Sequence, residues 1–246
     1  IPGEEHLIDN EGFLELERLP KRIVVVGGGY IACEFAGVLN GMGAKVTQLY
    51  RGKRILRGFD GEVAGFVQDE MIKKGVVIRL ESDVAAIGDP TDAGLTVELT
   101  TGETLEADAV LYATGRHPNS KGMGLEAAGV TLGAKGEVEV DAYSRTSVPS
   151  IWAIGDVTDR VALTPVAIRE GAAFARSAFE GDLTAADHEL IPTAVFTQPE
   201  IGTCGMTEEA AREAHDIEVY SAAFRPMIHT LSGRDERTMM KMIVDK

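Results

Sequence analysis

Hydrophobic and polar residues divide the first part of the chain into alternating strand-like and helix-like stretches. Residues 22–26 form an uninterrupted β-branched run, which is typical of a strand buried on both faces of a parallel sheet. Three glycines follow, then a helical pattern over 30–42 and a second strand-like stretch over 45–50. This order of strand, glycine turn, helix and strand predicts a βαβ unit.

The next stretch predicts a second helix and a small antiparallel sheet. Asp60 precedes a helical pattern over 61–74 and is placed to cap that helix. Short apolar runs over 76–80 and 109–113 predict two further strands. Between them, residues 82–107 alternate between polar and apolar with turn signals, so we expect a β-meander inserted in the domain.

The remaining patterns are shorter and less regular. The lead-in over 7–21 is polar, and we expect it to be irregular. The second half predicts several short elements. These are strands over 136–140 and 151–154, a helix over 165–179 with proline at its start, a helix near 208–215, and strands near 219–224 and 239–245.

Composition narrows the class of protein. The chain has 246 residues, 44% of them hydrophobic, with a formal net charge of −15. This charge excludes a general nucleic-acid surface, because phosphate binding needs cations. No apolar run is long enough to span a membrane. The two cysteines, Cys33 and Cys204, fit neither a disulfide framework nor a zinc site, so no metal site is predicted and a reducing cytoplasm is expected.

The glycine turn predicts a dinucleotide-binding site. Residues 27–32 fit the pattern G-x-G-x-x-A, with Gly27, Gly29 and Ala32 at the three key places. The first glycine permits the tight turn, the second lets the backbone approach a pyrophosphate, and the small third residue lets the helix pack closely. Its position between a strand and a helix is the context that the motif requires. A purely structural glycine turn is the alternative.

The end of the second strand indicates which dinucleotide binds. NAD-binding units usually place a carboxylate there for the ribose hydroxyls, whereas this chain has Tyr50 followed by a cationic loop. Arginine binds a 2′-phosphate that a carboxylate would repel. We therefore predict NADPH, with Arg51 and Arg57 as phosphate ligands and Lys53 and Arg54 as weaker candidates. A solvated loop is the alternative.

At this point the chain resembles a known family. Residues 27–34 and 51–60 are similar to the NADPH domain of the glutathione reductases, which belong to the pyridine nucleotide-disulfide oxidoreductases. Four later stretches resemble further features of that family, in its order. These are 113–119 (a strand exit beside both cofactors), 151–157 (the second FAD motif), 163–167 (the helix start beneath the flavin) and 191–196 (the opening of the dimerisation domain).

The resemblance implies an α/β fold in three parts. Residues 1–117 are expected to form a Rossmann-like NADPH-binding domain that carries the β-meander. Residues 118–190 would form the C-terminal part of an FAD-binding domain. Residues 191–246 would begin an α+β dimerisation domain, so we expect a homodimer in the full-length form. FAD and NADPH are the implied cofactors.

The resemblance also implies roles for particular residues. Tyr30 would cover the flavin where the nicotinamide stacks, and Glu34 would orient the carboxamide, although a packed tyrosine and a solvated glutamate are the alternatives. Asp156 would accept hydrogen bonds from the ribityl chain, or else cap a turn. Thr164 would direct a backbone amide at the flavin. The predicted cofactor-binding residues are Gly27, Gly29, Tyr30, Ile31, Ala32, Glu34, Arg51, Arg57, Gly115, Asp156, Leu163, Thr164 and Pro165.

The redox centre of such an enzyme is not visible in the sequence. The family uses a C-x-x-x-x-C dithiol, and Cys33 and Cys204 have no such spacing. We expect the dithiol, the first FAD motif and the His-Glu proton relay on segments outside residues 1–246, and we predict no catalytic residue within them. Cys33, at a helix start, is expected to be a packing residue rather than a stabilised thiolate. Cys204 is expected to be a core thiol.

The predicted function is NADPH-dependent reduction of glutathione disulfide through FAD and that dithiol. One departure concerns Ala172, where many glutathione reductases carry an arginine that binds glutathione. Arg169, one turn earlier, either compensates or is a surface charge. Trypanothione reductase therefore stays open. A non-catalytic nucleotide-binding fragment and an NADH-linked dihydrolipoamide dehydrogenase are two further alternatives. The stretches 224–227 and 231–234 resemble glutathione reductase more closely than they resemble dihydrolipoamide dehydrogenase.

Overall fold

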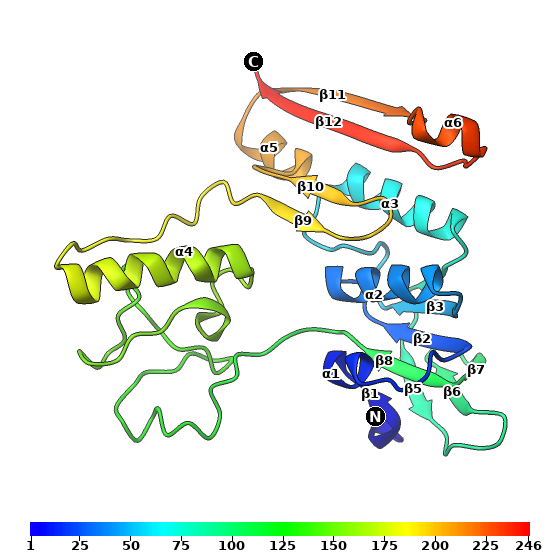
Figure 1. The fold of residues 1–246 in the computed structure, drawn as a ribbon, viewed down its shortest axis with the longest axis horizontal. Helices are drawn as coiled ribbons and strands as arrows, with labels where there is room; N and C mark the ends of the chain where they lie inside the picture. The colour runs from blue at the N-terminus through cyan, green and yellow to red at the C-terminus, as the bar shows by residue number, and fades with distance from the viewer. The chain divides into compact units, whose positions relative to one another are not determined.

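The computed structural model describes all residues from 1 to 246, and they form two compact units (Figure 1). One unit joins residues 1–115 to residues 192–246, and the other comprises residues 116–191. None of the helices combines the length and the apolar composition that crossing a bilayer requires.

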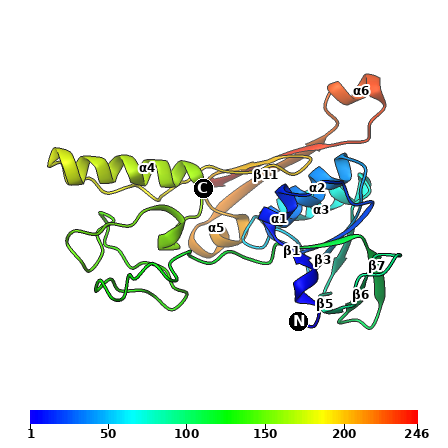
Figure 2. The same cartoon turned by 60° about the horizontal axis from the view of Figure 1, so that its bottom comes forward.

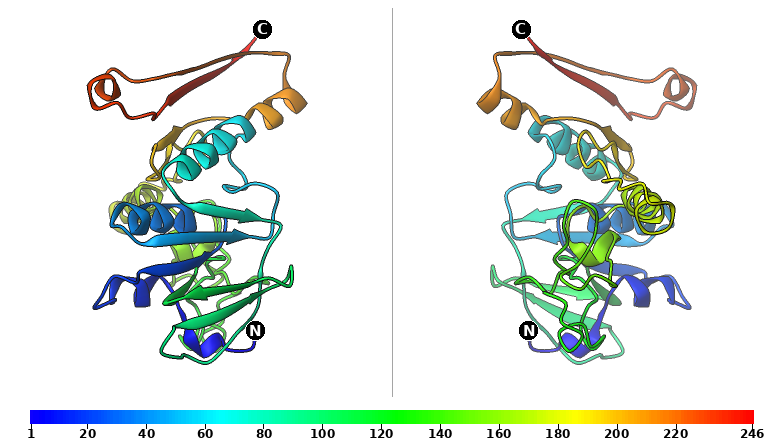
Figure 3. Two further views of the ribbon diagram at one scale, coloured as in Figure 1. Left: turned by 90° about the vertical axis from the view of Figure 1, so that its right-hand side faces the viewer. Right: turned by 90° about the vertical axis from the view of Figure 1, so that its left-hand side faces the viewer.

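A five-stranded parallel sheet forms the centre of the first unit (Figure 3). The predicted βαβ unit is confirmed, because strand β2 leads through helix α2 to strand β3 in parallel register. Strand β8 lies on the other side of β2. In sheet order, the strands are β1 (Leu7–Ile8), β8 (Ala109–Tyr112), β2 (Arg22–Val26), β3 (Lys45–Tyr50) and β4 (Val77–Leu80).

The two faces of β2 are buried in different layers, which explains its unbroken β-branched sequence. Ile23 and Val25 pack with helices α2 (Tyr30–Gly41) and α3 (Gly61–Lys73). Val24 and Val26 pack against the meander on the opposite face. Because side chains alternate along a strand, only apolar residues at every position can satisfy both layers.

The meander is the antiparallel sheet that the alternating pattern predicts. It consists of β5 (Val84–Ile87), β6 (Leu95–Leu99) and β7 (Thr104–Ala107). Its buried residues alternate with exposed ones along β6, as expected for a sheet with one face against a core.

The expectation of an irregular lead-in is wrong. Residues Leu7–Ile8 form β1, which pairs in parallel with β8, and helix α1 (Asn10–Leu14) follows. The Asp9 carboxylate caps α1 by accepting hydrogen bonds from its first amides. A two-residue strand carries no periodicity of its own, since its conformation depends on the neighbouring strand.

The second unit is largely irregular around one helix. The predicted helix begins one residue early as α4 (Thr164–Ala175) and continues as a π-helical turn, η3 (Arg176–Glu180). The strands expected over 136–140 and 151–154 are wrong. Val138 and Trp152 each make a single isolated bridge, because neither segment has a partner that runs beside it for several residues.

Residues 192–246 complete the first unit with two antiparallel pairs and two short helices. Helix α5 (Glu208–Ala214) and the hairpin of β11 (Ile217–Phe224) and β12 (Thr238–Asp245) match the predicted elements. The pair β9 (Thr193–Val195) and β10 (Ile201–Thr203) was not predicted. Nor was helix α6 (Ile228–Ser232), which lies at the end of the hairpin (Figure 2).

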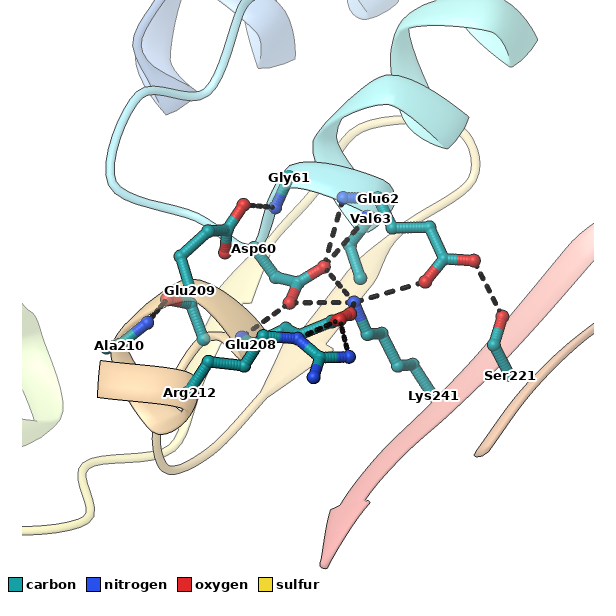
Figure 4. Close-up of polar contacts among 11 residues, drawn as sticks. Asp60, Gly61, Glu62, Val63, Glu208, Glu209, Ala210, Arg212, Ser221 and Lys241 are labelled. Carbon is teal, nitrogen blue, oxygen red and sulfur yellow. Dashed lines mark hydrogen bonds and ion pairs between the residues drawn. The ribbon is translucent and has the colours of Figure 1, made fainter. Parts of the chain in front are cut away.

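A charged cluster joins this C-terminal region to α3 (Figure 4). The Lys241 side chain on β12 is only 6% exposed, and its Nζ contacts three carboxylates. These are Asp60 at 2.8 and 3.0 Å, Glu208 at 2.6 Å and Glu62 at 3.1 Å. Asp60 also accepts hydrogen bonds from the Val63 amide of α3 and, across 148 positions, from the Glu208 amide. One ammonium group therefore connects three segments.

The charges of the cluster stabilise one another. Burial alone lowers the pKa of Lys241, but hydrogen bonds to Asp60, Glu208 and Glu62 outweigh it and raise that pKa. Burial likewise raises the pKa of Asp60, whereas hydrogen bonds from Lys241 and from backbone amides lower it further than burial raises it. The pKa of Glu208 is lowered by Lys241 and then by Arg212.

We expect Lys241→Met to lower the free energy of unfolding by about 3 kcal/mol, because three carboxylates lose a buried partner. The stabilisation that the ion pairs of Lys241 give to the folded state should be complete between about pH 5 and pH 10. It should vanish as pH falls through the lowered carboxylate pKa values, and again as pH rises through the raised lysine pKa. Urea unfolding across pH measures it, with exposed Lys45→Met as the control. Equal stability of the two variants at neutral pH would contradict the prediction.

Candidate dinucleotide-binding site

The turn between β2 and α2 is built so that two of its glycines cannot be replaced. Gly27 has φ 143°, and a Cβ added to it would lie 2.4 Å from the carbonyl oxygen of Ala113, beyond the end of β8. A Cβ on Gly28 would lie 2.4 Å from the ring of Tyr50. Both glycines are therefore required by close packing against neighbouring strands.

Gly29 differs from these two, because a Cβ built on it would meet nothing within 4 Å. It precedes the first residue of α2 and has an extended backbone. Packing within the chain therefore gives no reason for a glycine at this position. An open backbone at the N-terminus of a twelve-residue helix is the arrangement that accommodates a pyrophosphate.

Two buried side chains hold the turn from beneath. Ala32 is fully buried and lets α2 approach β2. Gln48 on β3 is also fully buried, and its Nε2 donates to the Gly27 carbonyl at 3.0 Å and to Cys33 Sγ at 3.3 Å. Sequence reasoning missed Gln48, because the strand also contains Lys45 and Thr47, so one more polar residue gives no sign that it is buried.

Cys33 is a packing residue, as expected. Its side chain is fully buried in the core beneath α2. Burial raises the pKa of Cys33 to about 12, although the hydrogen bond from Gln48 opposes this shift. The thiol is therefore neutral near pH 7 and does not act as a stabilised thiolate. The expectation for Cys204 is wrong, since that residue is exposed rather than in the core.

The cationic loop after β3 is fixed to the glycine turn. The Leu56 amide donates to the Gly28 carbonyl at 2.6 Å, and the side chains of Ile55 and Leu56 are fully buried. Between and beside these apolar residues, the side chains of Arg51 and Arg57 are exposed, and neither makes an ion pair. The loop thus holds two uncompensated guanidinium groups beside the turn.

The weaker candidates differ in their surroundings. Lys53 is exposed and unpaired. Arg54 is exposed but extends toward the start of α3, where a Cβ on Gly61 would lie 2.8 Å from its Nη1. Tyr50, at the position where NAD-binding units place an acid, lies with its ring against Gly28 and Gly52. No carboxylate therefore occupies that position.

The remaining predicted residues of this unit also lie around the turn. Tyr30 and Ile31 are half-buried in the first turn of α2, and Tyr30 packs against the core. Glu34 is not a solvated glutamate, because its Oε1 accepts a hydrogen bond from the Phe196 amide at 2.9 Å. Gly115 is exposed, and a Cβ on it would meet nothing within 4 Å.

The other predicted residues belong to the second unit. Asp156 lies in a 3-10 turn, η2 (Gly155–Thr158), and its side chain is 41% exposed and paired with Arg116. Leu163 caps the start of α4, where Thr164 and Pro165 are exposed. The turn packs on this helix, because a Cβ on Gly155 would lie 3.2 Å from that of Ala167. The structure thus brings Asp156 and the start of α4 into one region.

The sequence matches a family profile described as pyridine nucleotide-disulphide oxidoreductase over residues 1–171. A second profile, the dimerisation domain of the same family, matches residues 191–246. Together the two matches cover the chain except for residues 172–190.

Individual relatives agree with the profiles. A glutathione reductase from Burkholderia cepacia is 48% identical over 246 residues, which are 100% of this chain and 55% of that protein. The chloroplastic/mitochondrial glutathione reductase of Pisum sativum is 48% identical over 245 residues, or 99% of this chain and 44% of that protein. A trypanothione reductase from Leishmania donovani is 44% identical over 249 residues, which are 99% of this chain and 50% of that protein. The chain spans about half the length of these curated relatives.

Solved structures show the same fold. The HOCl-induced flavoprotein disulfide reductase RclA from Escherichia coli superimposes with a TM-score of 0.90 at 32% identity. The match covers 100% of this chain and 57% of that one. The parallel sheet, the meander and the C-terminal hairpin are therefore the architecture of a flavoprotein disulfide reductase.

Two neighbouring glycines are expected to respond differently to alanine. Gly28→Ala should lower the free energy of unfolding by about 1–3 kcal/mol, because its Cβ would overlap the Tyr50 ring. Gly29→Ala should change it by less than about 1 kcal/mol, yet weaken NADPH binding by about tenfold or more. Urea unfolding and calorimetric titration separate the two effects. A Gly29→Ala variant that binds NADPH normally would show that no phosphate approaches this turn.

Proposed function

Because the chain belongs to the pyridine nucleotide-disulphide oxidoreductase family, we propose that it is part of an NADPH-dependent flavoprotein that reduces glutathione disulfide. The redox dithiol of the enzyme is proposed to lie outside residues 1–246. The observation that carries the proposal is the loop after β3, which holds Arg51 and Arg57 exposed and unpaired beside an open glycine turn.

The charge of this loop supports NADPH rather than NADH. Four of the seven residues from 51 to 57 are lysine or arginine, in a protein with 39 acidic and 24 basic residues, so the loop is a local concentration of positive charge. A dinucleotide seated at Gly29 would have its adenosine end near the loop after β3, as in other units of this type. There Arg51 and Arg57 can donate to a 2′-phosphate, while Tyr50 offers no carboxylate to repel it.

The chain's residues contribute binding and orientation. In such an enzyme the cofactors supply the transfer of a hydride from NADPH to FAD and of its electrons to a disulfide. Gly27, Gly29, Ile31 and Ala32 provide the phosphate turn. Tyr30 and Glu34 are proposed to position the nicotinamide. The hydrogen bond from Phe196 fixes the orientation of Glu34 and leaves its second oxygen for such a contact.

The second unit offers the groups for a flavin. We propose that the half-exposed Asp156 carboxylate accepts hydrogen bonds from the ribityl hydroxyls. Leu163, Thr164 and Pro165 would lie beneath the ring at the start of α4, where unpaired amides favour negative charge on the reduced flavin. Gly115, the last residue of the first unit's N-terminal segment, is proposed as a further cofactor-binding residue.

Glutathione disulfide is the proposed substrate on the strength of the relatives. The departure at Ala172 keeps trypanothione disulfide as the second candidate, in line with the trypanothione reductases that also match. Arg169 is exposed and donates to the carbonyl of Asp187 at 3.2 Å, so it is held near the position of Ala172 by a neutral partner. This arrangement leaves its charge for a substrate carboxylate.

Assembly and location are part of the proposal. The match of residues 191–246 to a dimerisation domain supports a homodimer. A cytoplasmic location is proposed because a reducing compartment suits an enzyme that makes thiols. The Pisum sativum relative is named for chloroplasts and mitochondria, so fractionation of cells tests this point directly.

Reversing the charge of the loop tests the choice of cofactor. We expect Arg51→Glu and Arg57→Glu each to raise the dissociation constant for NADPH by about 10- to 100-fold, because each removes a charge-assisted hydrogen bond to the phosphate. Affinity for NADH should change by no more than about twofold. Arg18 is exposed and makes no ion pair, so Arg18→Glu is the matched control for the change in net charge. If both loop variants bind NADPH as the control does, the phosphate site is elsewhere.

A comparison of two lengths tests the proposed activity. The full-length protein that contains this chain should reduce glutathione disulfide with NADPH, whereas residues 1–246 alone should bind NADPH without turnover, because they contain no C-x-x-x-x-C dithiol. Oxidation of NADPH, followed by absorbance, is the measurement. Turnover by the short form would contradict the placement of the dithiol. A preference for trypanothione disulfide would replace the substrate but keep the reductase.

A further inference from the structure

The second unit contains a buried carboxylate that the proposed function does not use. Glu170 on α4 is 1% exposed, and its carboxylate lies behind the turn that carries Asp156. Its Oε2 accepts a hydrogen bond from the Gly155 amide at 2.5 Å. Its Oε1 contacts Arg160 Nη2 at 2.8 Å and His188 Nε2 at 2.6 Å.

These contacts close into a ring around the turn. The Thr158 hydroxyl donates to the Gly155 carbonyl at 2.8 Å, and Arg160 Nε donates to that hydroxyl oxygen at 3.3 Å. Arg160 also contacts Glu170, which holds the Gly155 amide. Both the amide and the carbonyl of Gly155 are thus bound through one connected set of side chains. Asp156 is the next residue along the chain.

The backbone at Gly155 also packs closely on α4. Gly155 is buried with φ 70°, and a Cβ there would lie 3.2 Å from Ala167, so the turn is pressed against α4. A charge as deeply buried as Glu170 is costly unless it is paired and hydrogen-bonded. Simple packing of α4 would not require a carboxylate, because an apolar side chain fills such a position at lower cost.

We propose that Glu170 is a positioning residue for the flavin. Through Gly155, Thr158 and Arg160 it fixes the direction of the Asp156 carboxylate toward the ribityl chain. Arg116 pairs with Asp156, so the charge of this carboxylate is balanced by a cation. This inference rests on the proposed function, because it assumes that the second unit binds FAD at Asp156.

Glu170→Gln tests the proposal in the full-length protein. Glutamine still accepts from the Gly155 amide, but its amide group would face the Arg160 guanidinium as a donor facing a donor. We expect the FAD dissociation constant, measured by flavin fluorescence, to rise by about tenfold or more. Calorimetric NADPH affinity should be unchanged, because the glycine turn lies in the other unit. The matched control is Glu180→Gln, an exposed glutamate that makes no ion pair.

A second pair of variants changes the ring without removing a charge. Thr158→Val deletes the hydroxyl with little change of shape and should weaken FAD binding, whereas Thr158→Ser should restore it. Because the ring acts as one unit, Thr158→Val should add little to the effect of Glu170→Gln in the double variant. Simple additivity of the two effects would argue for independent packing roles and overturn the proposal.

The outcomes separate this inference from the proposed function. A wild-type full-length protein that takes up no FAD would overturn the proposed function itself. A wild type that holds FAD while Glu170→Gln and Thr158→Val hold it equally well would overturn only the role of Glu170. Equal loss of FAD from the Glu180→Gln control would do the same. If Glu170→Gln also loses NADPH binding, FAD binding by Thr158→Val and Thr158→Ser tests the proposal instead. Weaker binding by Thr158→Val that Thr158→Ser restores would support it, and unchanged binding by both would overturn it.

Discussion

Close approach of three backbone segments at the carboxyl edge of the parallel sheet is the constraint on which the binding site depends. The turn after β2 touches the end of β8 at Gly27 and the ring of Tyr50 at Gly28. The loop after β3 is joined to the same turn by the hydrogen bond from the Leu56 amide. Any side chain at the first two glycines would separate these segments, whereas one at Gly29 would meet only open space.

This constraint links the fold to the choice of cofactor. Burial of Ile55 and Leu56 fixes the path of the loop, so the guanidinium groups of Arg51 and Arg57 are held at the surface beside the turn. Tyr50 fills the gap between Gly28 and Gly52 with an aromatic ring rather than a carboxylate. The same packing that closes the turn therefore removes the negative charge that would favour NADH.

The local parts of the fold were predictable because their signals are local. The buried run of β2, the glycine spacing and the Asp60 cap are each readable within a few residues, and the structure has them where expected. The two-residue strand β1 was missed because its state depends on β8. The strands predicted in the second unit are wrong because an apolar segment forms a strand only where another segment pairs with it over several residues. Lys241 contacts Asp60 across 181 positions, and no spacing rule reaches so far.

For the site, the glycine motif and the cationic loop were visible in the sequence, and their assigned roles stay predictions. The supporting residues were not visible. Gln48 and Glu170 look like ordinary polar residues in the sequence, and only the fold shows that each is buried against a glycine turn. The exposure of Cys204 was likewise hidden, because its neighbours Thr203 and Gly205 do not indicate whether the residue after β10 is buried.

A crystal structure of the full-length protein with NADPH would show directly whether the dinucleotide binds at the glycine turn. We expect the pyrophosphate at the amides that follow Gly29 and the adenosine 2′-phosphate within hydrogen-bonding distance of Arg51 and Arg57. A dinucleotide bound elsewhere, or one whose 2′-phosphate lies in solvent away from both arginines, would contradict this expectation.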